Sequence, residues 1–280
     1  LAGKEVLEFD PGDAPQITIV LVLYNRAALT LLCLRSLLEH GDVPFQLVMV
    51  DNQSSDDTAA LLDRIQGATI LRNDSNLGFV LAVNQGAAEA TADTILLLNN
   101  DAVIEDKALG NALATLNSDA SIGAVGAKIK LLDGQLQEAG SLIWNDGACL
   151  GYGRTADPLA PEYMFQRDVD YCSGAFLLFR RQTFTELGGF DEAYAPAYYE
   201  ESDFCIRLHE QGLRVVYDPT VQISHYEFAS SGGLKGASAL QAEHRKILCK
   251  KHPDYLQARA DNNPDNVLWG RIANDYPNVL

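Results

Sequence analysis

Residues 17–56 of this 280-residue chain read ITIVLVLYNRAALTLLCLRSLLEHGDVPFQLVMVDNQSSD. The stretch begins with an apolar run at 17–23, continues through an amphipathic segment at 27–39, and returns to an apolar run at 46–50. Apolar runs of this length are typical of buried strands, and the segment between them is typical of a helix. A strand, a helix and a second strand form the unit from which parallel sheets are built, so the stretch predicts an α/β protein.

The same alternation continues as far as Leu132 and predicts a Rossmann-like, mostly parallel sheet. We expect strands at Ile17–Tyr24, Gln46–Val50, Thr69–Arg72 and Thr94–Leu98. The intervening helices are expected at Ala27–Glu39, Asp56–Ile65 and Phe79–Ala90.

Beyond Leu132 the pattern breaks into shorter pieces, which predicts a smaller mixed region attached to the sheet. Glycine and polar residues are frequent from Asp133 to Pro161, and we expect hairpins or loops there. A regular pattern then returns, with a buried strand, a helix, two short strands and a C-terminal helix at Cys172–Arg180, Glu200–Gln211, Arg214–Tyr217, Val221–Ser224 and Ala237–Lys251.

The composition excludes several classes of protein. The formal net charge of −17, from 21 Lys and Arg against 38 Asp and Glu residues, argues against binding nucleic acid through a broad basic surface. The five cysteines are scattered without a CxxC pair, which fits neither a disulfide framework nor a zinc site, and favours a reducing cytoplasm. No apolar run approaches the roughly 18 to 20 residues of a membrane span, so no transmembrane segment is expected. Because the first residue is not Met, we expect further domains of a longer parent chain.

Three predicted strands end in polar residues, at Tyr24–Arg26, Asp51–Asp56 and Asn99–Asp101. In a doubly wound sheet, ligands bind in the crevice outside the carboxyl ends of the strands. One polar residue after a strand is ordinary turn chemistry, whereas three such sets at one edge favour a ligand site.

Two common nucleotide motifs are absent from the sequence. No G-x-G-x-x-G follows the first strand and no G-x-x-x-x-G-K-[ST] occurs, which disfavours NAD enzymes and P-loop hydrolases. The strand ends instead place Asp51 where it could accept a hydrogen bond from the imide N–H of a base. They place Asp101 where a carboxylate could hold Mg2+ or Mn2+ on a diphosphate. The alternative for Asn99 and Asn100 is that they only close the turn after the strand.

Seven segments stand out in order between residues 17 and 230: Ile19–Asn25, Val50–Asp56, Asn76–Phe79 with Asn84–Gly86, Leu97–Asp101, Ser173–Ala175, Gly188–Glu192 and Tyr199–Arg207. Together they resemble family 2 glycosyltransferases of the GT-A fold, and most of all their rhamnosyltransferase and O-antigen branch. The resemblance is highly specific for the family and only weakly specific for the sugar.

This resemblance implies an inverting, metal-dependent transfer of a sugar from a nucleoside-diphosphate donor to an acceptor hydroxyl, in surface polysaccharide or O-antigen synthesis. The donor is expected to be a UDP- or dTDP-sugar, the acceptor a glycan or lipid-linked glycan, and the cofactor Mn2+ or Mg2+. Residues 1–101 would form the nucleotide-sugar half, 102–235 the catalytic and acceptor-side half, and 236–280 a C-terminal helical tail. The expected location is the cytoplasm, either free or at the inner face of the membrane.

Carried over to this chain, the resemblance makes Asp51 the residue that reads the base. It puts Asn99–Asp101 at the family's DXD position, where Asn99 replaces the first Asp, Asp101 remains as metal ligand and His225 is a further ligand. The nucleotide site is expected to comprise Tyr24, Asn25, Asp51, Arg72, Asn76 and Gly78. The donor and acceptor sugars are expected at Asn100, Gly174, Asp191 and Glu200.

Glu200 and Glu201 fall where the family has a Glu-Asp pair whose second member is the catalytic base. On the predicted helix, Glu201 shares the apolar face and is expected to point inward toward the crevice. Glu200 shares a polar face with Asp203 and Arg207, where exposure and helical ion pairing are expected. We therefore predict Glu201 as the base, and the alternative is that both acids only cap the helix start.

Structural alternatives apply to other candidates as well. Ser173–Ala175 is expected to let the backbone approach a sugar closely, or else to be a buried strand that needs small residues. His225 has the alternative of a hydrogen-bonded structural residue. Arg72 is the cation expected near the nucleotide, ahead of Arg154 and Arg207, and surface ion pairing is the alternative for each.

Two rival functions are considered, one from departures from the family pattern and one because nucleotidyltransferases use a similar α/β sheet. A catalytically silent nucleotide-sugar-binding module is favoured by Asn99 in the DXD position and by Glu in place of the catalytic Asp. A nucleotidyltransferase is disfavoured because no Gly-rich, Lys-bearing loop follows the first strand.

Overall fold

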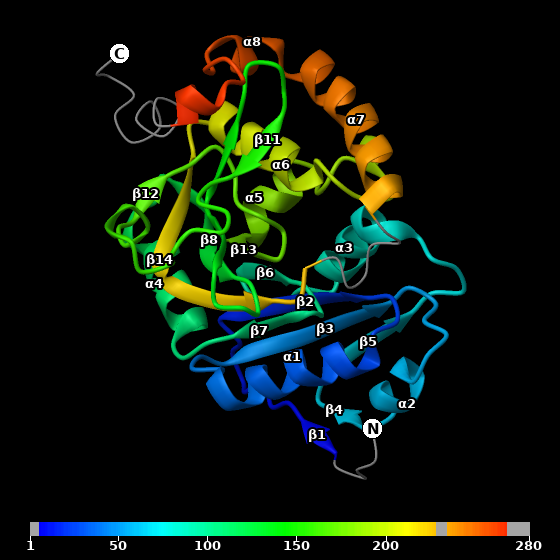
Figure 1. Cartoon of the computed structure of the whole chain (residues 1–280). Coiled ribbons are helices and arrows are strands. Elements are labelled where there is room, and N and C mark those ends of the chain that lie inside the picture. The colour runs from blue at the N-terminus through cyan, green and yellow to red at the C-terminus, as the bar shows by residue number, and fades with distance from the viewer. Residues whose placement is uncertain (1–5, 228–233, 268–280) are drawn as a thin grey trace.

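The computed structural model describes residues 6–227 and 234–267, which are organised around a ten-stranded sheet (Figure 1). The strands follow one another in the order β12-β14-β8-β13-β6-β2-β3-β5, while β7 pairs with β14 and β9 pairs with β8. Helices cover both faces of the sheet. The predicted α/β class is confirmed.

The N-terminal half supplies four parallel strands, β2 (Ile17–Leu23), β3 (Phe45–Asp51), β5 (Thr69–Arg72) and β6 (Thr94–Leu98). Three helices connect them, α1 (Ala27–His40), α2 (Thr58–Leu62) and α3 (Gly78–Ala88). All seven correspond to predicted elements. Helix α2 ends earlier than predicted because Ile65 leaves it to form β4 (Ile65–Gln66), which pairs with β1 (Leu7–Glu8).

Alternate side chains of β2 enter two different cores, one on each face of the sheet. Ile19 and Leu21 belong to the same core as Leu34 of α1, and Val20 belongs to the same core as Val80 of α3. Successive side chains of a strand point to opposite faces, and here both faces are covered. The strand is therefore apolar at nearly every position, which is why its sequence predicts it well.

The second half contains elements that the sequence pattern did not single out: β7 (Ala102–Ile104), α4 (Ala108–Ser118), β8 (Ile122–Lys130) and α5 (Arg181–Glu186). Strand β13 (Phe176–Arg180) lies antiparallel between β6 and β8. It begins later than the predicted strand because the Ser173 carbonyl accepts the Phe176 N–H in a turn (3.2 Å). The prediction of two strands at 214–217 and 221–224 is wrong: they form one strand, β14 (Arg214–His225), whose register against β8 shifts between Asp218 and Gln222.

The region predicted to be rich in hairpins contains β9 (Leu136–Ala139) and the hairpin of β10 (Ser141–Ile143) with β11 (Cys149–Gly151). It is followed by the short elements η1 (Pro161–Tyr163) and β12 (Arg167–Asp168).

The C-terminal part is helical, with η2 (Glu192–Tyr194), α6 (Glu200–Glu210), α7 (Leu234–Lys251), α8 (Pro253–Gln257) and η3 (Pro264–Asn266). Figure 1 shows α6, α7 and α8 gathered at the end of the molecule opposite α2 and β1. Within the described ranges, no helix combines the length and the apolar character that crossing a membrane requires.

Candidate active site

The loops that follow β2 and β3 are joined by hydrogen bonds, so Asn25 and Asp51 lie in one network. Asn25 donates its N–H to Ser54 Oγ (2.8 Å), and Asn25 Oδ1 accepts the Ser55 N–H (2.8 Å). Asp51 Oδ1 accepts the Ser54 N–H (2.9 Å). Tyr24 lies at the same edge with an exposed side chain. The structure thus brings these three predicted nucleotide residues together at the carboxyl edge of the sheet.

Arg72 pairs in register with Asp51 on the neighbouring strand, but its guanidinium turns elsewhere. Arg72 Nη2 lies 2.9 Å from Asp63 Oδ1, and both side chains are largely exposed. The surface ion pair that was the alternative for Arg72 is present.

Gly78 sits where no larger residue fits. Its φ of +81° favours glycine, and an added Cβ would lie 2.5 Å from the Cβ of Pro196. Asn76 Oδ1 accepts the Gly78 N–H (2.9 Å), and Asn52 Nδ2 donates to the Gly78 carbonyl (2.9 Å). The Asn76–Gly78 turn therefore holds the start of α3 beside the end of β3.

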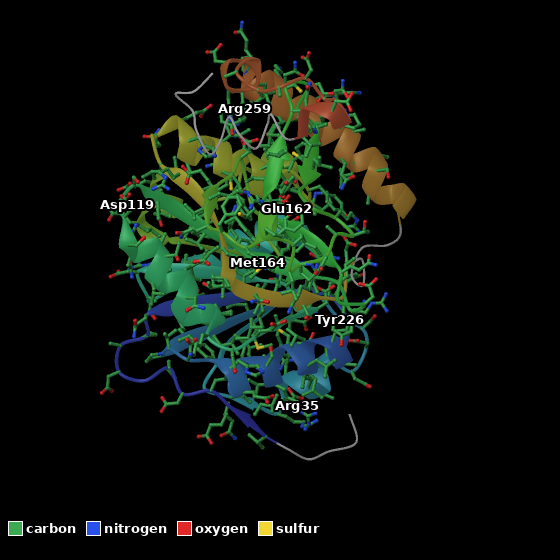
Figure 2. All side chains as sticks on the ribbon, turned by 60° about the vertical axis from the view of Figure 1, so that its left-hand side comes forward. Arg35, Asp119, Glu162, Met164, Tyr226 and Arg259 are labelled. Carbon is green, nitrogen blue, oxygen red and sulfur yellow. The ribbon has the colours of Figure 1, made fainter. Side chains whose placement is uncertain are left out.

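Asp101 and His225, the two predicted metal ligands, lie against each other. His225 Nε2 is 3.1 Å from Asp101 Oδ1 and 3.3 Å from Asn99 Nδ2, and both predicted ligands are buried. Tyr226, labelled in Figure 2, continues the contact by donating its N–H to the Asp101 carbonyl (2.9 Å). The ends of β6 and β14 thus place the pair at one point.

The hydrogen bonds of His225 fit a metal ligand. Its Nδ1 lies 2.9 Å from Gln137 Oε1, an acceptor, so Nδ1 carries the hydrogen. The other nitrogen then directs a lone pair toward the Asp101 carboxylate, and two acceptors in contact need a proton or a metal ion between them. Orientation of a ligating histidine through its second nitrogen is common in metal sites.

The described residues contain no group of three or more His, Cys, Asp or Glu side chains able to hold a metal ion. Asp101 and His225 are two ligands, and Asn99 is neutral. Mg2+ is commonly bound by one or two protein ligands together with substrate phosphates and water, and imidazole is an acceptable ligand for Mn2+. The residues present therefore fit a cation that is bound jointly with a diphosphate.

Asn100 is buried, and its amide Nδ2 donates to Thr30 Oγ1 of α1 at 2.9 Å. This bond ties the turn after β6 to the first helix. The predicted contact of Asn100 with a sugar therefore competes with a bond inside the protein.

Glu200 and Glu201 begin α6 and are the least satisfied acids of the site. The Oε2 atom of each is buried and has no hydrogen-bond partner among the described residues. Burial raises the pKa of both carboxyls, and the neighbouring Glu201 charge raises the pKa of Glu200 further. Two acids that share one low-dielectric site do not ionise together easily.

The expectation that Glu200 is exposed is wrong, because only 5% of its surface is accessible. Asp203, on the same polar face, is fully buried as well and forms an ion pair with Arg207 (2.7 Å). The predicted helical ion pairing is thus present between Asp203 and Arg207 and does not involve Glu200. Arg207 thus forms an ion pair, which was the structural alternative to a role near the nucleotide.

Glu138 of β9 belongs to the same cluster, although no pattern in the sequence predicted it. Its Oε1 accepts the Ser173 N–H (3.2 Å), and the residue is buried. Burial raises the pKa of Glu138 to about 7, with Ser173 opposing the shift and the charge of Glu201 adding to it. The local sequence LQEAG reads as an ordinary strand segment, and no motif distinguishes this acid.

Glu138→Gln is expected to stabilise the fold above pH 7 and to leave it unchanged near pH 4.5. A carboxyl whose pKa is raised by folding binds its proton more tightly in the native state, so stability falls as pH rises from about 4.5 to about 7. Removing the carboxyl abolishes this loss, which is of order 1 to 3 kcal/mol. Denaturant unfolding at pH 4.5 and pH 8 measures it, with exposed Glu162→Gln (Figure 2) as control. An equal pH dependence in wild type and Glu138→Gln would contradict the prediction.

The Ser173–Ala175 turn joins Glu138 to the end of β6. Besides the Ser173 contact with Glu138, the Ala175 carbonyl accepts the Asn99 N–H (3.1 Å). An added Cβ at Gly174 would meet the Phe79 ring at 3.8 Å, an ordinary contact, so internal packing does not require glycine there.

Two further predicted residues are engaged in ion pairs. Asp191 caps η2 by accepting the Ala193 N–H (2.9 Å), and its Oδ2 lies 2.6 Å from Lys251 Nζ. Arg154 forms two hydrogen bonds with Glu227, at 2.8 and 2.5 Å. The ion-pair alternative for Arg154 therefore describes what the structure contains.

A family model described as glycosyl transferase family 2 matches residues 18–188. The chain belongs to this family. As predicted, it is a glycosyltransferase. The match includes the ends of β2, β3 and β6 and the Ser173–Ala175 turn, while α6, β14 and the C-terminal helices lie beyond it.

Known proteins similar to this family 2 glycosyltransferase agree with the predicted branch and fold. An N-acetylglucosaminyl-diphospho-decaprenol L-rhamnosyltransferase of Mycobacterium tuberculosis is 29% identical over 241 residues, which cover 77% of this chain and 78% of the relative. The O-antigen biosynthesis protein RfbC of Myxococcus xanthus is 28% identical over 226 residues, which cover 77% of this chain. The match spans only 18% of the length of RfbC.

The fold is shared with a solved mannosyltransferase, PcManGT from Pyrobaculum calidifontis, described in complex with GDP-Man and Mn2+. The TM-score is 0.59 at 20% sequence identity, over 84% of this chain and 63% of that one. At this identity the similarity concerns the fold alone, and it confirms the predicted GT-A class.

Proposed function

We propose that this glycosyltransferase moves a sugar from a UDP- or dTDP-sugar to a hydroxyl of a glycan or lipid-linked acceptor, with inversion at the anomeric carbon. The observation that carries the proposal is the pair of adjacent acids Glu200 and Glu201, whose buried Oε2 atoms have no hydrogen-bond partner among the described residues. Such an oxygen is available to a substrate hydroxyl, and buried acids with raised pKa values are common at catalytic sites. The names of the two relatives support a role in O-antigen or related polysaccharide synthesis.

Strand β9 supports the assignment of the carboxylates and the metal pair to one site. Gln137 contacts His225. The next residue, Glu138, accepts the Ser173 N–H, and the charge of Glu201 raises its pKa. That turn is in contact with Asn99 through the Ala175 carbonyl. A chain of contacts through β9 and the Ser173–Ala175 turn thus links the two groups of side chains.

In the proposed reaction, Glu201 accepts the proton of the acceptor hydroxyl, and the oxygen of that hydroxyl attacks the anomeric carbon of the donor sugar. The bond between that carbon and the diphosphate breaks as the new bond forms, and one displacement inverts the configuration. The raised pKa of Glu201 strengthens it as a base, but only above that pKa is it ionised. Proton transfer by a positioned base contributes about 10²- to 10⁴-fold in rate.

Asp101 and His225 would hold Mn2+ or Mg2+, which when bound neutralises the negative charge of the departing diphosphate. A local cation matters because the chain itself carries a net charge of −17. Gln137 orients His225 through its second nitrogen, Nδ1.

Asp51→Ala is expected to weaken UDP or dTDP binding by about 1 to 3 kcal/mol, because it removes the buried carboxylate that accepts a hydrogen bond from the imide N–H of the pyrimidine. Isothermal calorimetry measures the change. Asp51→Asn keeps an oxygen for the Ser54 N–H and separates loss of base recognition from loosening of the loop. Asp57→Ala, at an exposed position without a side-chain capping bond, is the matched control. Equal affinities of wild type and Asp51→Ala would exclude Asp51 as the residue that reads the base.

The division of labour that we propose gives residues 1–101 the nucleotide sugar and 102–235 the catalysis and the acceptor. Of the helical tail predicted at 236–280, residues 268–280 lie outside the described residues, and the first helix, α7, begins at Leu234. A cytoplasmic location, free or at the inner face of the membrane, is supported by five free cysteines, since reducing compartments keep thiols unpaired.

A screen of nucleotide sugars by thermal shift, with and without Mn2+, tests the proposed function, followed by transfer assays with the donors that bind. We expect a UDP- or dTDP-sugar to raise the melting temperature and to be turned over. Binding without transfer to any glycan or lipid-linked acceptor would favour a silent binding module instead. Absence of binding by every donor would contradict the proposal.

A further inference from the structure

The C-terminal helices reach the start of α6 through three side chains, His244, Lys251 and His252. Figure 1 shows α7 and α8 beside α6 at one end of the molecule. Both histidines are only 3% exposed, so these contacts belong to the protein interior.

His244 supports a strained stretch of backbone directly before Glu200. Tyr198 and Tyr199 have φ angles of 77° and 73°, in the left-handed region that bulky residues rarely adopt. His244 Nδ1 lies 2.9 Å from the Tyr198 carbonyl oxygen and donates a hydrogen bond to it. The same ring stands edge-on to Tyr194, with 5.6 Å between centroids. Such backbone persists only where neighbouring contacts hold it, and it is frequent at functional sites.

Asp203, in the first turn of α6, is where the C-terminal segment attaches. His252 Nε2 (2.9 Å) and Lys251 Nζ (2.7 Å) both donate to its Oδ1, and Arg207 Nε donates to its Oδ2 (2.7 Å). Burial works to raise the pKa of Asp203, but His252, Arg207 and Lys251 outweigh burial and lower it to about 2. The carboxylate is therefore ionised at any pH at which the enzyme works.

His252 bridges two carboxylates of α6. Its Nδ1 lies 2.8 Å from Glu210 Oε1, and its Nε2 faces Asp203. An ionised carboxylate only accepts hydrogen bonds, so both ring nitrogens carry hydrogen and the ring is an imidazolium. Burial favours the neutral ring, but the two carboxylates outweigh it and raise the pKa of His252. Both bonds are thus present below pH 6.5, and one of them is lost as pH rises through the raised pKa, because the neutral ring keeps a single N–H.

The remaining charges facing His252 complete a neutral cluster. Lys251 also contacts Asp191 (2.6 Å), and the Tyr194 hydroxyl donates to Asp203 (3.2 Å). With His252 protonated, three acids meet three cations: Asp191, Asp203, Glu210, Arg207, Lys251 and His252. Deprotonation of His252 leaves an excess of buried negative charge against the first turn of α6.

We propose that His244, Lys251 and His252 are positioning residues that hold the first turn of α6, and with it the carboxylates of Glu200 and Glu201. The proposal rests on the proposed function, in which Glu201 is the base. All three residues lie outside 18–188, the stretch that the family model matches. The active site is therefore completed by C-terminal helices that are an integral part of the catalytic framework.

Two substitutions test the two kinds of contact separately. His252→Gln loses the imidazolium, and His244→Leu loses the donor to Tyr198. Each is expected to lower kcat by about 10- to 100-fold, since a small misplacement of a catalytic group is enough for such a loss, while KM for the donor changes little. Wild-type kcat is expected to decline as pH rises through the raised pKa of His252, and His252→Gln lacks this decline.

Conservative variants and an exposed neighbour serve as controls. His244→Asn keeps a donor near the position of Nδ1 and is expected to recover most of the activity lost in His244→Leu. Lys251→Gln is expected to lower kcat, whereas Lys250→Gln, at the exposed neighbouring position, leaves it unchanged. Hydrogen exchange of the backbone amides of 199–204 is expected to accelerate in His252→Gln and His244→Leu, and to stay slow in His244→Asn.

Wild-type kcat in both His252→Gln and His244→Leu would overturn the positioning role. The positioning role would also be overturned if the loss of kcat were no greater than the fraction of unfolded protein, measured by thermal unfolding, and the pH profile of kcat were unchanged. If the wild type transfers no sugar at all, the proposed function fails, and hydrogen exchange alone decides the positioning role. Unchanged exchange at 199–204 in both variants would then overturn it.

Discussion

Glu201→Gln is expected to lower sugar transfer by about 10²- to 10⁴-fold while the affinity for the donor persists. Glutamine has nearly the size and shape of glutamate but cannot take the acceptor proton. Because Glu201 Oε2 has no partner among the described residues, the substitution breaks no internal hydrogen bond at that atom. Single-turnover transfer rates and donor calorimetry, measured on the same preparations, separate chemistry from binding.

Glu200→Gln is the matched control, and we expect it to reduce sugar transfer much less. The reason is not the exposure that was predicted from the sequence. Glu200 is buried beside Glu201, and its pKa is raised well above the usual value by burial and by that neighbour. A protonated carboxyl resembles a carboxamide in charge and shape, so glutamine should be tolerated there. Wild-type transfer by Glu201→Gln together with an inactive Glu200→Gln would move the base to Glu200.

Asp101→Asn is expected to cost several kcal/mol of transition-state stabilisation, a loss of about 10²- to 10⁴-fold in turnover. The substitution removes the only charged oxygen ligand that we assign to the cation, and it leaves His225 with an amide in place of a carboxylate. Chelation by EDTA should suppress wild-type transfer, and Mn2+ or Mg2+ should restore it. The dependence of rate on metal concentration should shift to higher concentrations in Asp101→Asn.

Asp106→Asn is a suitable control for the metal experiment, since this acid is exposed and bonds His40 on the surface. Full wild-type activity in excess EDTA would count decisively against Asp101 as a metal ligand. The charge of the diphosphate would then have to be balanced by a side chain, and Arg72 would first have to leave Asp63 to do so.

The sequence predicted the N-terminal half well because local and tertiary signals agree there. Strands β5 and β6 have the predicted bounds. Strand β2 is covered on both faces, and its uninterrupted apolar run is therefore what burial requires. Strand ends in a parallel sheet converge by topology, which is why Asn25, Asp51 and Asp101 could be assigned to one edge before their contacts were known.

The burial of Glu200 and Asp203, and the presence of Glu138 in the site, escaped prediction because they depend on residues distant in the sequence. Helix α6 reads as half polar, yet Asp203 on its polar face is buried against Lys251 and His252, about fifty residues further along the chain. Hydropathy counts Asp203 as a surface residue, although four donors surround it. Glu138 is similar, since its partners are the Ser173 turn and Glu201 rather than anything near it in sequence.

Strand β13 fills the middle of the sheet from late in the chain, between β6 and β8. On the ribosome, both neighbours emerge well before residues 176–180, which must later enter between them. Until then β6 presents an unpaired row of backbone groups, a template for wrong pairing with another nascent chain. A fragment cut at residue 101 retains that open edge permanently. The proposed nucleotide-sugar half is thus not an independent folding unit, and the sheet becomes resistant to misassembly only when its central strand arrives.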